Sequence, residues 1–147
     1  FDDDNIIIIH ASGLSYEIIA LVKIVIIWLF IQAPFFIIIP IAVMLLNIEF
    51  SKLEIIFTTF FLGSIIITCI ASISGSMNLL NKENFTLGSL ILMLLSIPVI
   101  IFSVGSTEAS IDMAKTQTNI LLGIMFFFLS ISPWICGMCI KISLQNK

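Results

Sequence analysis

The sequence contains no arginine, a single histidine and few charges of either sign. Only 10% of its 147 residues are charged, against about a quarter in a typical soluble domain. All six basic residues are lysines and the net charge is −3, so the chain lacks the basic patch of nucleic-acid-binding proteins and the guanidinium groups that bind phosphates in bidentate fashion. These absences argue against a nucleic-acid-binding domain.

Motifs for nucleotide binding and disulfide bonding are also missing. The chain has no GxxxxGK[ST] sequence, so it does not cradle a nucleotide's phosphates by itself. Cys69, Cys136 and Cys139 are odd in number and lie in apolar stretches, which predicts no disulfide framework. Cys136 and Cys139 form a CxxC, yet Ile140 follows where covalent haem attachment requires histidine. We expect this pair to act as small apolar side chains, with a redox or metal role as the alternative.

What the chain has instead is apolar sequence, at 60% hydrophobic residues and a mean hydropathy of +1.25. A membrane-crossing helix needs about 20 apolar residues, and four stretches are long enough: 24–46, 55–73, 85–104 and 120–140. The sequence therefore predicts an all-α integral membrane protein with four transmembrane helices. None of the four stretches contains Lys, Arg, Asp, Glu or His, which argues against a proton relay or an ion-coupled carrier.

Two polar side chains need separate mention. Gln32 is the one strongly polar residue well inside a predicted span. His10, the only histidine, follows an apolar run, and a lone imidazole is able to ligate haem iron. Because no second ligand is in view, we expect His10 to be an interfacial or loop residue.

The lysines indicate which way the chain crosses the membrane. Four spans place both ends of the chain on one side, and lysine is enriched in short cytoplasmic loops. Four lysines fall on the side of the ends and two on the other, which favours cytoplasmic ends: Lys23, Lys82, Lys141 and Lys147 against Lys52 and Lys115. Glu108, Asp112 and Lys115 fit a short solvated helix in the third link; we expect a solvated link here, either such a helix or a loop, with partner docking as the alternative.

Prolines and small residues predict how the helices bend and pack. Proline removes a backbone donor and clashes with the preceding turn. We expect the first span to be kinked or broken, and further kinks in the later spans, at Pro34, Pro40, Pro98 and Pro133. A stripe of small residues on the second span predicts a helix-packing face, with a substrate-lining face as the alternative. This Ser64–Ser76 stripe consists of Ser64, Thr68, Ala71, Ser72, Gly75 and Ser76.

Several short segments follow one another along the chain in a characteristic order: FDDD at 1–4, Leu14-Ser15 leading to Lys23 and Trp28, PIAVMLL at 40–46, LSIPVIIF at 95–102, and SPW at 132–134 continuing to IKISLQ at 140–145. Together these segments resemble the haem exporter protein B (CcmB) family along essentially the whole chain. The resemblance implies one partial permease domain over residues 1–147, corresponding to the last four of six spans. It also implies a non-enzymatic membrane subunit of an ABC transporter for c-type cytochrome biogenesis.

Partners and site residues follow from the same resemblance. It implies a separate CcmA-like ATPase, CcmC- and CcmD-like membrane subunits and a CcmE-like haem chaperone, in a bacterial inner membrane or a mitochondrial one. Haem is then a cargo of the complex, and no cofactor is assigned to this chain. We expect the acidic segment Phe1, Asp2, Asp3 and Asp4 to dock on the ATPase, because carboxylates pair with basic groups of a soluble partner. The alternatives are a passive membrane scaffold and an ABC-2 permease for lipid or polysaccharide.

Overall fold

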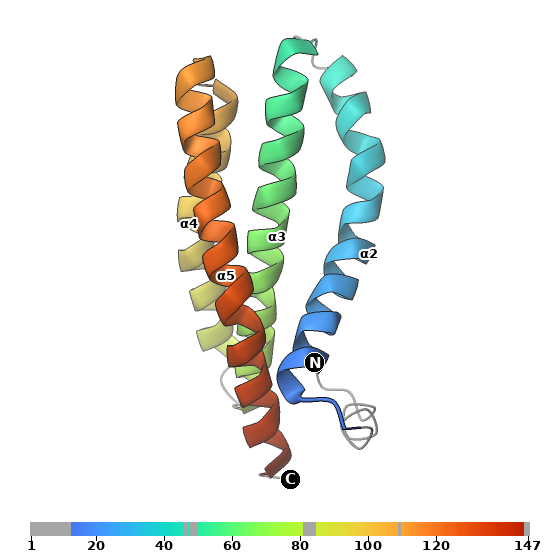
Figure 1. Ribbon diagram of the computed structural model, residues 1–147, viewed down its shortest axis with the longest axis vertical. Coiled ribbons are helices and arrows are strands. Elements are labelled where there is room, and N and C mark those ends of the chain that lie inside the picture. The colour runs from blue at the N-terminus through green and yellow to red at the C-terminus, as the bar shows by residue number, and fades with distance from the viewer. Residues whose placement is uncertain (1–12, 46, 48–49, 81–84, 109, 146–147) are drawn as a thin grey trace.

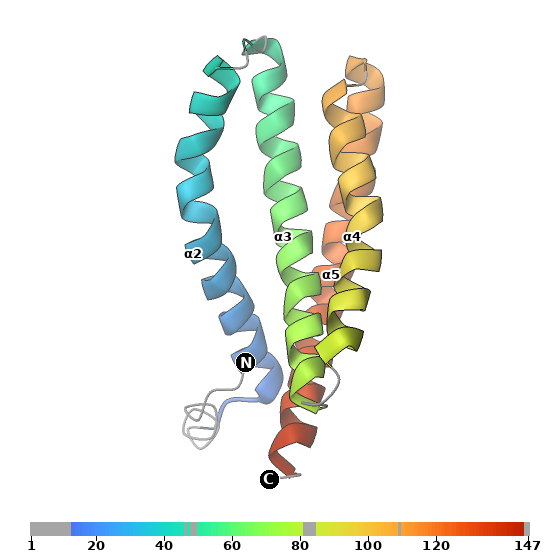
Figure 2. The same ribbon diagram turned by 180° about the vertical axis from the view of Figure 1, so that it is seen from behind.

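The computed structural model describes residues 13–45, 47, 50–80, 85–108 and 110–145. This part of the chain consists of four α-helices and contains no strand: α2 (Tyr16–Leu45), α3 (Phe50–Leu80), α4 (Phe85–Glu108) and α5 (Ile111–Gln145). The helices alternate in direction, so α2 begins at the end of the bundle where α5 finishes (Figures 1 and 2). All four are long and apolar enough to cross a membrane, which confirms the predicted fold class.

The helices extend beyond the apolar spans predicted for them. α3 begins at Phe50 rather than at residue 55, and α5 begins at Ile111 rather than at residue 120. Hydropathy marks only the stretch that lies in hydrocarbon, whereas a helix can continue into the polar interface. The sequence predicts a solvated loop or a short separate helix in the third link, but within the described residues Glu108 ends α4 and Asp112 lies in the first turn of α5.

Proline does not break the first span. α2 is a single helix that contains both Pro34 and Pro40, while α4 contains Pro98 and α5 contains Pro133. Each proline leaves a carbonyl one turn earlier without its usual donor. Such carbonyls are tolerated in membrane helices where neighbouring groups satisfy them. The kinks expected at these four positions stay predictions.

Large apolar side chains cover the outside of the bundle. Phe30, Leu45 and Met93 are 77%, 81% and 72% exposed. Such exposure would be an aggregation hazard in water, but in a bilayer these side chains face lipid of the same polarity. α3 is the central helix. In its apolar stretch 44% of the residues are buried inside the bundle, against 11% for α2 and α4 and 22% for α5.

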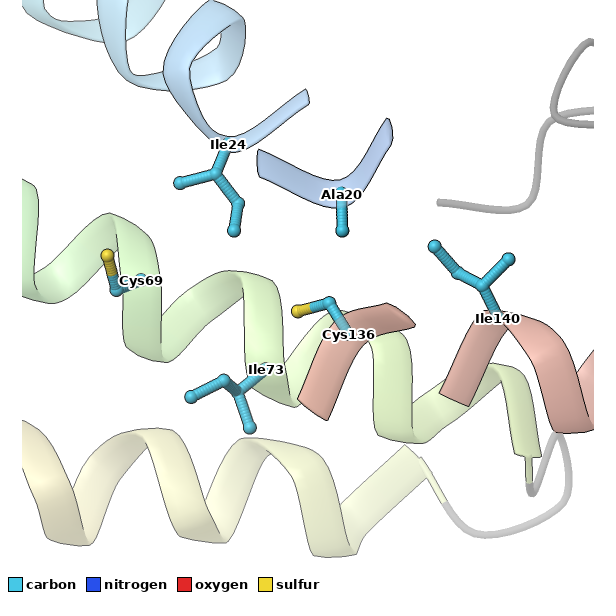
Figure 3. Close-up of a cluster of buried hydrophobic side chains, with 6 residues drawn as sticks. All are labelled: Ala20, Ile24, Cys69, Ile73, Cys136 and Ile140. Carbon is cyan, nitrogen blue, oxygen red and sulfur yellow. The ribbon is translucent and has the colours of Figure 1, made fainter. Parts of the chain in front are cut away.

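Two apolar clusters join the helices. The first, shown in Figure 3, brings together α2, α3 and α5 through Ala20, Ile24, Cys69, Ile73, Cys136 and Ile140. The second joins α3 to α4 and α5 through Leu62, Ile66, Ile70, Val99 and Leu121. Because lipid tails are as apolar as these side chains, close van der Waals packing rather than escape from water stabilises both clusters.

Two glycines allow helix backbones to approach closely. A Cβ atom on Gly137 of α5 would lie 3.1 Å from the backbone nitrogen of Glu17 on α2. A Cβ atom on Gly88 of α4 would lie 2.8 Å from the carbonyl oxygen of Ser74 on α3. Only glycine fits these two crossings without a shift of the helices, so both residues help to set the distance between neighbouring helices.

Candidate functional site

A groove of about 530 Å³ runs between α2 and α4, with α3 as its floor. We call it the α2–α4 groove. Its floor is formed by two neighbouring rows of α3 residues spaced four apart, which lie on one face of a helix: Thr59, Gly63, Ile67 and Ala71 beside Phe60, Ser64, Thr68 and Ser72. Its walls are mainly apolar and include Ile27, Ile31 and Phe35 of α2 and Val99, Ile100 and Val104 of α4.

Two buried polar side chains of the groove lack hydrogen-bond partners within the described residues. Gln32 of α2 and Thr59 of α3 are each 2% exposed, and neither Gln32 Nε2 nor Thr59 Oγ1 has a partner. A buried polar atom that makes no hydrogen bond costs about 1–3 kcal/mol. In a membrane no bulk water compensates for it. Gln32 and Thr59 both line the groove, and each holds a buried polar atom that has no hydrogen-bond partner within the described residues.

Three other polar side chains beside the groove, Trp28, Ser64 and Thr68, make hydrogen bonds within the chain. Trp28 Nε1 of α2 donates to Ser64 Oγ of α3 at 3.0 Å, and Ser64 Oγ donates to the carbonyl oxygen of Phe61 at 2.8 Å. Thr68 Oγ1 donates to the carbonyl oxygen of Ser64 at 2.8 Å. The Trp28 ring also packs edge-on against the Phe61 ring, with 5.3 Å between their centroids. These contacts tie α2 to α3 along one side of the groove.

The residues of the Ser64–Ser76 stripe lie in two different environments. Ser64, Thr68, Ala71 and Ser72 line the α2–α4 groove. Ser76 lies instead in the interior of the bundle, where its hydroxyl donates to Cys136 Sγ of α5 at 3.4 Å. Gly75 is half-buried. The stripe predicted as one packing surface is thus partly engaged with α5 and partly open to the groove.

The three cysteines are buried and unpaired between α3 and α5. Cys69 and Cys136 are 0% exposed and Cys139 is 6% exposed. Ser132 Oγ of α5 donates to the carbonyl oxygen of Cys69 at 3.3 Å, so polar contacts here join the helices. Among the described residues, no three His, Cys, Asp or Glu side chains are placed to hold a metal ion. His10 and the acidic segment at residues 1–4 lie outside the described residues.

Ionisable side chains lie toward the two ends of the bundle. The end that contains the start of α2 carries Glu17, Lys23 and Lys141, and the opposite end carries Lys52, Glu54, Glu108, Asp112 and Lys115. None of them lines the α2–α4 groove. Lys82 and Lys147 fall outside the described part of the chain. The centre of the bundle is therefore uncharged in the part that the structure describes.

These features define a multi-span α-helical membrane protein with a mainly apolar groove between α2 and α4. Comparison with known families then identifies it more narrowly. The sequence model of the CcmB protein family matches residues 1–143, so the chain belongs to the CcmB family. The match covers all four helices apart from the last residues of α5.

Heme exporter protein B of Haemophilus influenzae is a relative of the chain. The two are 30% identical over 129 residues, which make up 86% of this chain. The chain spans 58% of the length of that relative. No solved structure matches the chain significantly.

Sequence reasoning found some of the groove and missed its key property. It singled out Gln32 and four of the floor residues, but it did not place Thr59 in a site. A lone threonine in an apolar stretch is unremarkable by itself. Two facts about Thr59 follow only from the packing of the helices: its hydroxyl has no hydrogen-bond partner, and it lines the same groove as Gln32.

Proposed function

We propose that this chain is the membrane permease subunit of an ABC-type haem exporter complex required for c-type cytochrome biogenesis. The observation that carries the proposal is its membership of the CcmB family over residues 1–143, together with the 30% identity to Heme exporter protein B. The all-helical bundle with four candidate membrane spans fits a permease. The chain itself is not an enzyme in this proposal, and ATP hydrolysis takes place in a separate CcmA-like subunit.

The remaining parts of the complex are proposed from the same family membership. CcmC- and CcmD-like proteins are the other membrane subunits, and a CcmE-like chaperone receives haem. Haem is a cargo of the complex rather than a cofactor bound by this chain. The complex lies in the inner membrane of a bacterium or, alternatively, of a mitochondrion.

Deletion of the gene tests the cargo. We expect loss of covalently bound haem from all c-type cytochromes, measured by haem staining of membrane proteins after denaturing electrophoresis. Normal cytochrome levels in the deletion strain would instead support an ABC-2 permease for another cargo, such as lipid or polysaccharide.

Docking on the ATPase is proposed for the acidic segment Phe1–Asp4, which lies outside the described residues. Three neighbouring carboxylates next to a membrane span can pair with basic side chains of a soluble partner and set its register. Replacing Asp2, Asp3 and Asp4 by Asn in the full-length protein removes the charge and keeps the size. We expect less ATPase to co-purify in detergent, and unchanged recovery together with unchanged cytochrome maturation would refute this role.

A passive scaffold is the second candidate, favoured by the small-residue floor of the α2–α4 groove, which suits close helix packing. In that case the Ser64–Ser76 stripe holds membrane partners together and no transport depends on it. An ATPase-dead partner separates the two functions. Normal cytochrome maturation with the inactive ATPase, but none without this chain, would favour the scaffold over the permease.

A further inference from the structure

We propose that the α2–α4 groove binds an uncharged, elongated molecule with a carbonyl-bearing head, of the chemical class of the isoprenoid quinones. The head accepts hydrogen bonds from Gln32 Nε2 and from the Thr59 hydroxyl, while the apolar tail lies along the walls of the groove. This proposal does not rest on haem export, since it concerns only this surface of the chain.

The size and lining of the groove suit a small ligand. Its volume of about 530 Å³ lies within the range of about 300–1,000 Å³ that ligand pockets occupy. Such pockets are mostly apolar and contain a few well-placed polar groups that orient the ligand. In the α2–α4 groove apolar walls surround Gln32 and Thr59 in that way.

The two unpartnered polar atoms indicate what the head must offer. Gln32 Nε2 is a hydrogen-bond donor and needs an acceptor, whereas the Thr59 hydroxyl is able to donate or accept. A plain hydrocarbon chain would leave both atoms unsatisfied in a region without bulk water. A carbonyl oxygen satisfies the amide, and it does so without bringing a charge into the membrane.

Charged ligands fit this groove poorly. None of its lining residues is ionisable, so a carboxylate or phosphate would meet no countercharge there. Burying an unpaired charge is far more costly than burying a hydrogen-bonded neutral group. The ionised propionates of haem are therefore disfavoured at this position, which separates the groove from the proposed cargo of the complex.

The depth of Gln32 separates quinones from phospholipids. Gln32 lies about 20 Å along α2 from the nearer helix end, at a rise of 1.5 Å per residue. The predicted span of this helix, 24–46, begins eight residues or about 12 Å before Gln32, so Gln32 lies well inside a hydrocarbon core that is about 30 Å thick. A phospholipid keeps its charged headgroup and ester groups at the interface, whereas a molecule with a neutral head can enter the core.

The floor of the groove differs from the lipid-facing surface elsewhere. Other outward positions carry large side chains such as Phe30 and Met93, whereas the floor carries Gly, Ala, Ser and Thr at every position except Phe60 and Ile67. Small residues deepen a groove and leave room for a bound molecule. Filling this room should displace the ligand, so Ala71 offers a direct test.

The test is the quinone content of the complex purified in non-ionic detergent from a host that makes ubiquinone. Organic extraction and mass spectrometry give the ubiquinone and phospholipid bound per chain. We expect about one ubiquinone per wild-type chain, at least a fivefold loss in Ala71→Phe, and about a threefold loss in Gln32→Leu and in Thr59→Val, as for one hydrogen bond within a membrane. Ala33→Phe, on an exposed position of α2 outside the groove, should change nothing.

A second measurement uses added decylubiquinone as the probe. In a Trp134→Phe background the remaining tryptophan of this chain is Trp28, which is hydrogen-bonded to the floor residue Ser64. We expect saturable quenching of its fluorescence, weakened about threefold by Gln32→Leu. Gln117→Leu is the matched control, because Gln117 also has an unpartnered buried amide atom but does not line the groove.

These measurements either support quinone binding in the α2–α4 groove or overturn it. Gln32→Leu is close in size to the wild-type side chain and removes an unmet polar atom, so it should fold even if Ala71→Phe does not. A folded Gln32→Leu protein with the wild-type quinone content overturns the proposal. So does retention of phospholipid in place of quinone, if that retention is lost in the groove variants. Neither readout depends on haem export, so failure here leaves the proposed function untouched.

Discussion

The indole N–H of Trp28 on α2 donates a hydrogen bond to the hydroxyl of Ser64 on α3, with 3.0 Å between the two heavy atoms. α2 is among the least buried helices of the bundle, since only 11% of the residues in its apolar stretch are buried. A directional polar link to the central helix therefore matters more for α2 than it would for a helix surrounded by others. Hydrogen bonds between helices in a membrane contribute about 0.6–1.7 kcal/mol.

Replacing Trp28 by Phe should loosen this contact. The variant keeps an aromatic ring next to Phe61 and loses the donor to Ser64. We expect the free energy of unfolding in detergent to fall by about 1 kcal/mol, measured by denaturant titration followed by circular dichroism. Trp134→Phe is the control, since Trp134 is 60% exposed on the outside of α5 and its replacement should have little effect. Equal stability of the two variants would contradict a role for the hydrogen bond.

Gly137→Ala should disturb the crossing of α2 and α5. The added Cβ atom would lie 3.1 Å from the backbone nitrogen of Glu17 and 3.2 Å from its Cα, and backbone atoms cannot move aside as a side chain can. Overpacking of this kind typically costs about 1–3 kcal/mol. The thermal unfolding temperature in detergent should fall accordingly.

Gly123→Ala on the same helix is a matched control. A Cβ atom at Gly123 has no neighbour within 4 Å. Alanine is favoured over glycine in a helix by up to about 1 kcal/mol, so this variant should be as stable as the wild type or more so. If both variants lost stability to the same degree, the close approach at Gly137 would not be the cause.

The sequence was sufficient to predict the membrane spans because their cause is local. An apolar run of about 20 residues has to be helical in lipid, where each backbone polar group must be satisfied within its own segment. The same argument says nothing about where a helix stops outside the hydrocarbon. The start of α5 at Ile111 and the end of α4 at Glu108 were therefore missed.

The groove depends on how the helices pack, which is a non-local property. The four-residue spacing from Ser64 to Ser76 predicted one packing face. It could not show that Ser76 donates a hydrogen bond to Cys136 while Ser64 and Ser72 line the groove. Similarly, Gln32 was recognised as polar, yet its lack of a partner depends on what α3 and α4 place around it.

The buried cysteines should be unreactive in the folded protein. Cys69 and Cys136 are fully buried and Cys139 nearly so, and thiol reagents need access to sulfur. We expect no labelling by a maleimide in native detergent solution and labelling of all three after denaturation. Ser110→Cys, at an exposed position between α4 and α5, should react within minutes as a positive control. Fast labelling of the native protein without that substitution would contradict the burial of the three thiols.

The direction of insertion is open to a similar labelling experiment. Ser110 directly precedes α5 and Gln145 is its last residue, so the two lie at opposite ends of the bundle, as Figure 1 shows for the two ends of α5. Lysines of the whole chain favour the end with Lys23 and Lys141, and lysine-rich ends are retained in the cytoplasm. In intact cells a membrane-impermeant maleimide should therefore label Ser110→Cys and not Gln145→Cys, while both react in broken membranes. Labelling of Gln145→Cys alone would reverse the orientation, and would place the acidic segment, together with the proposed ATPase contact, on the side where no ATP is available.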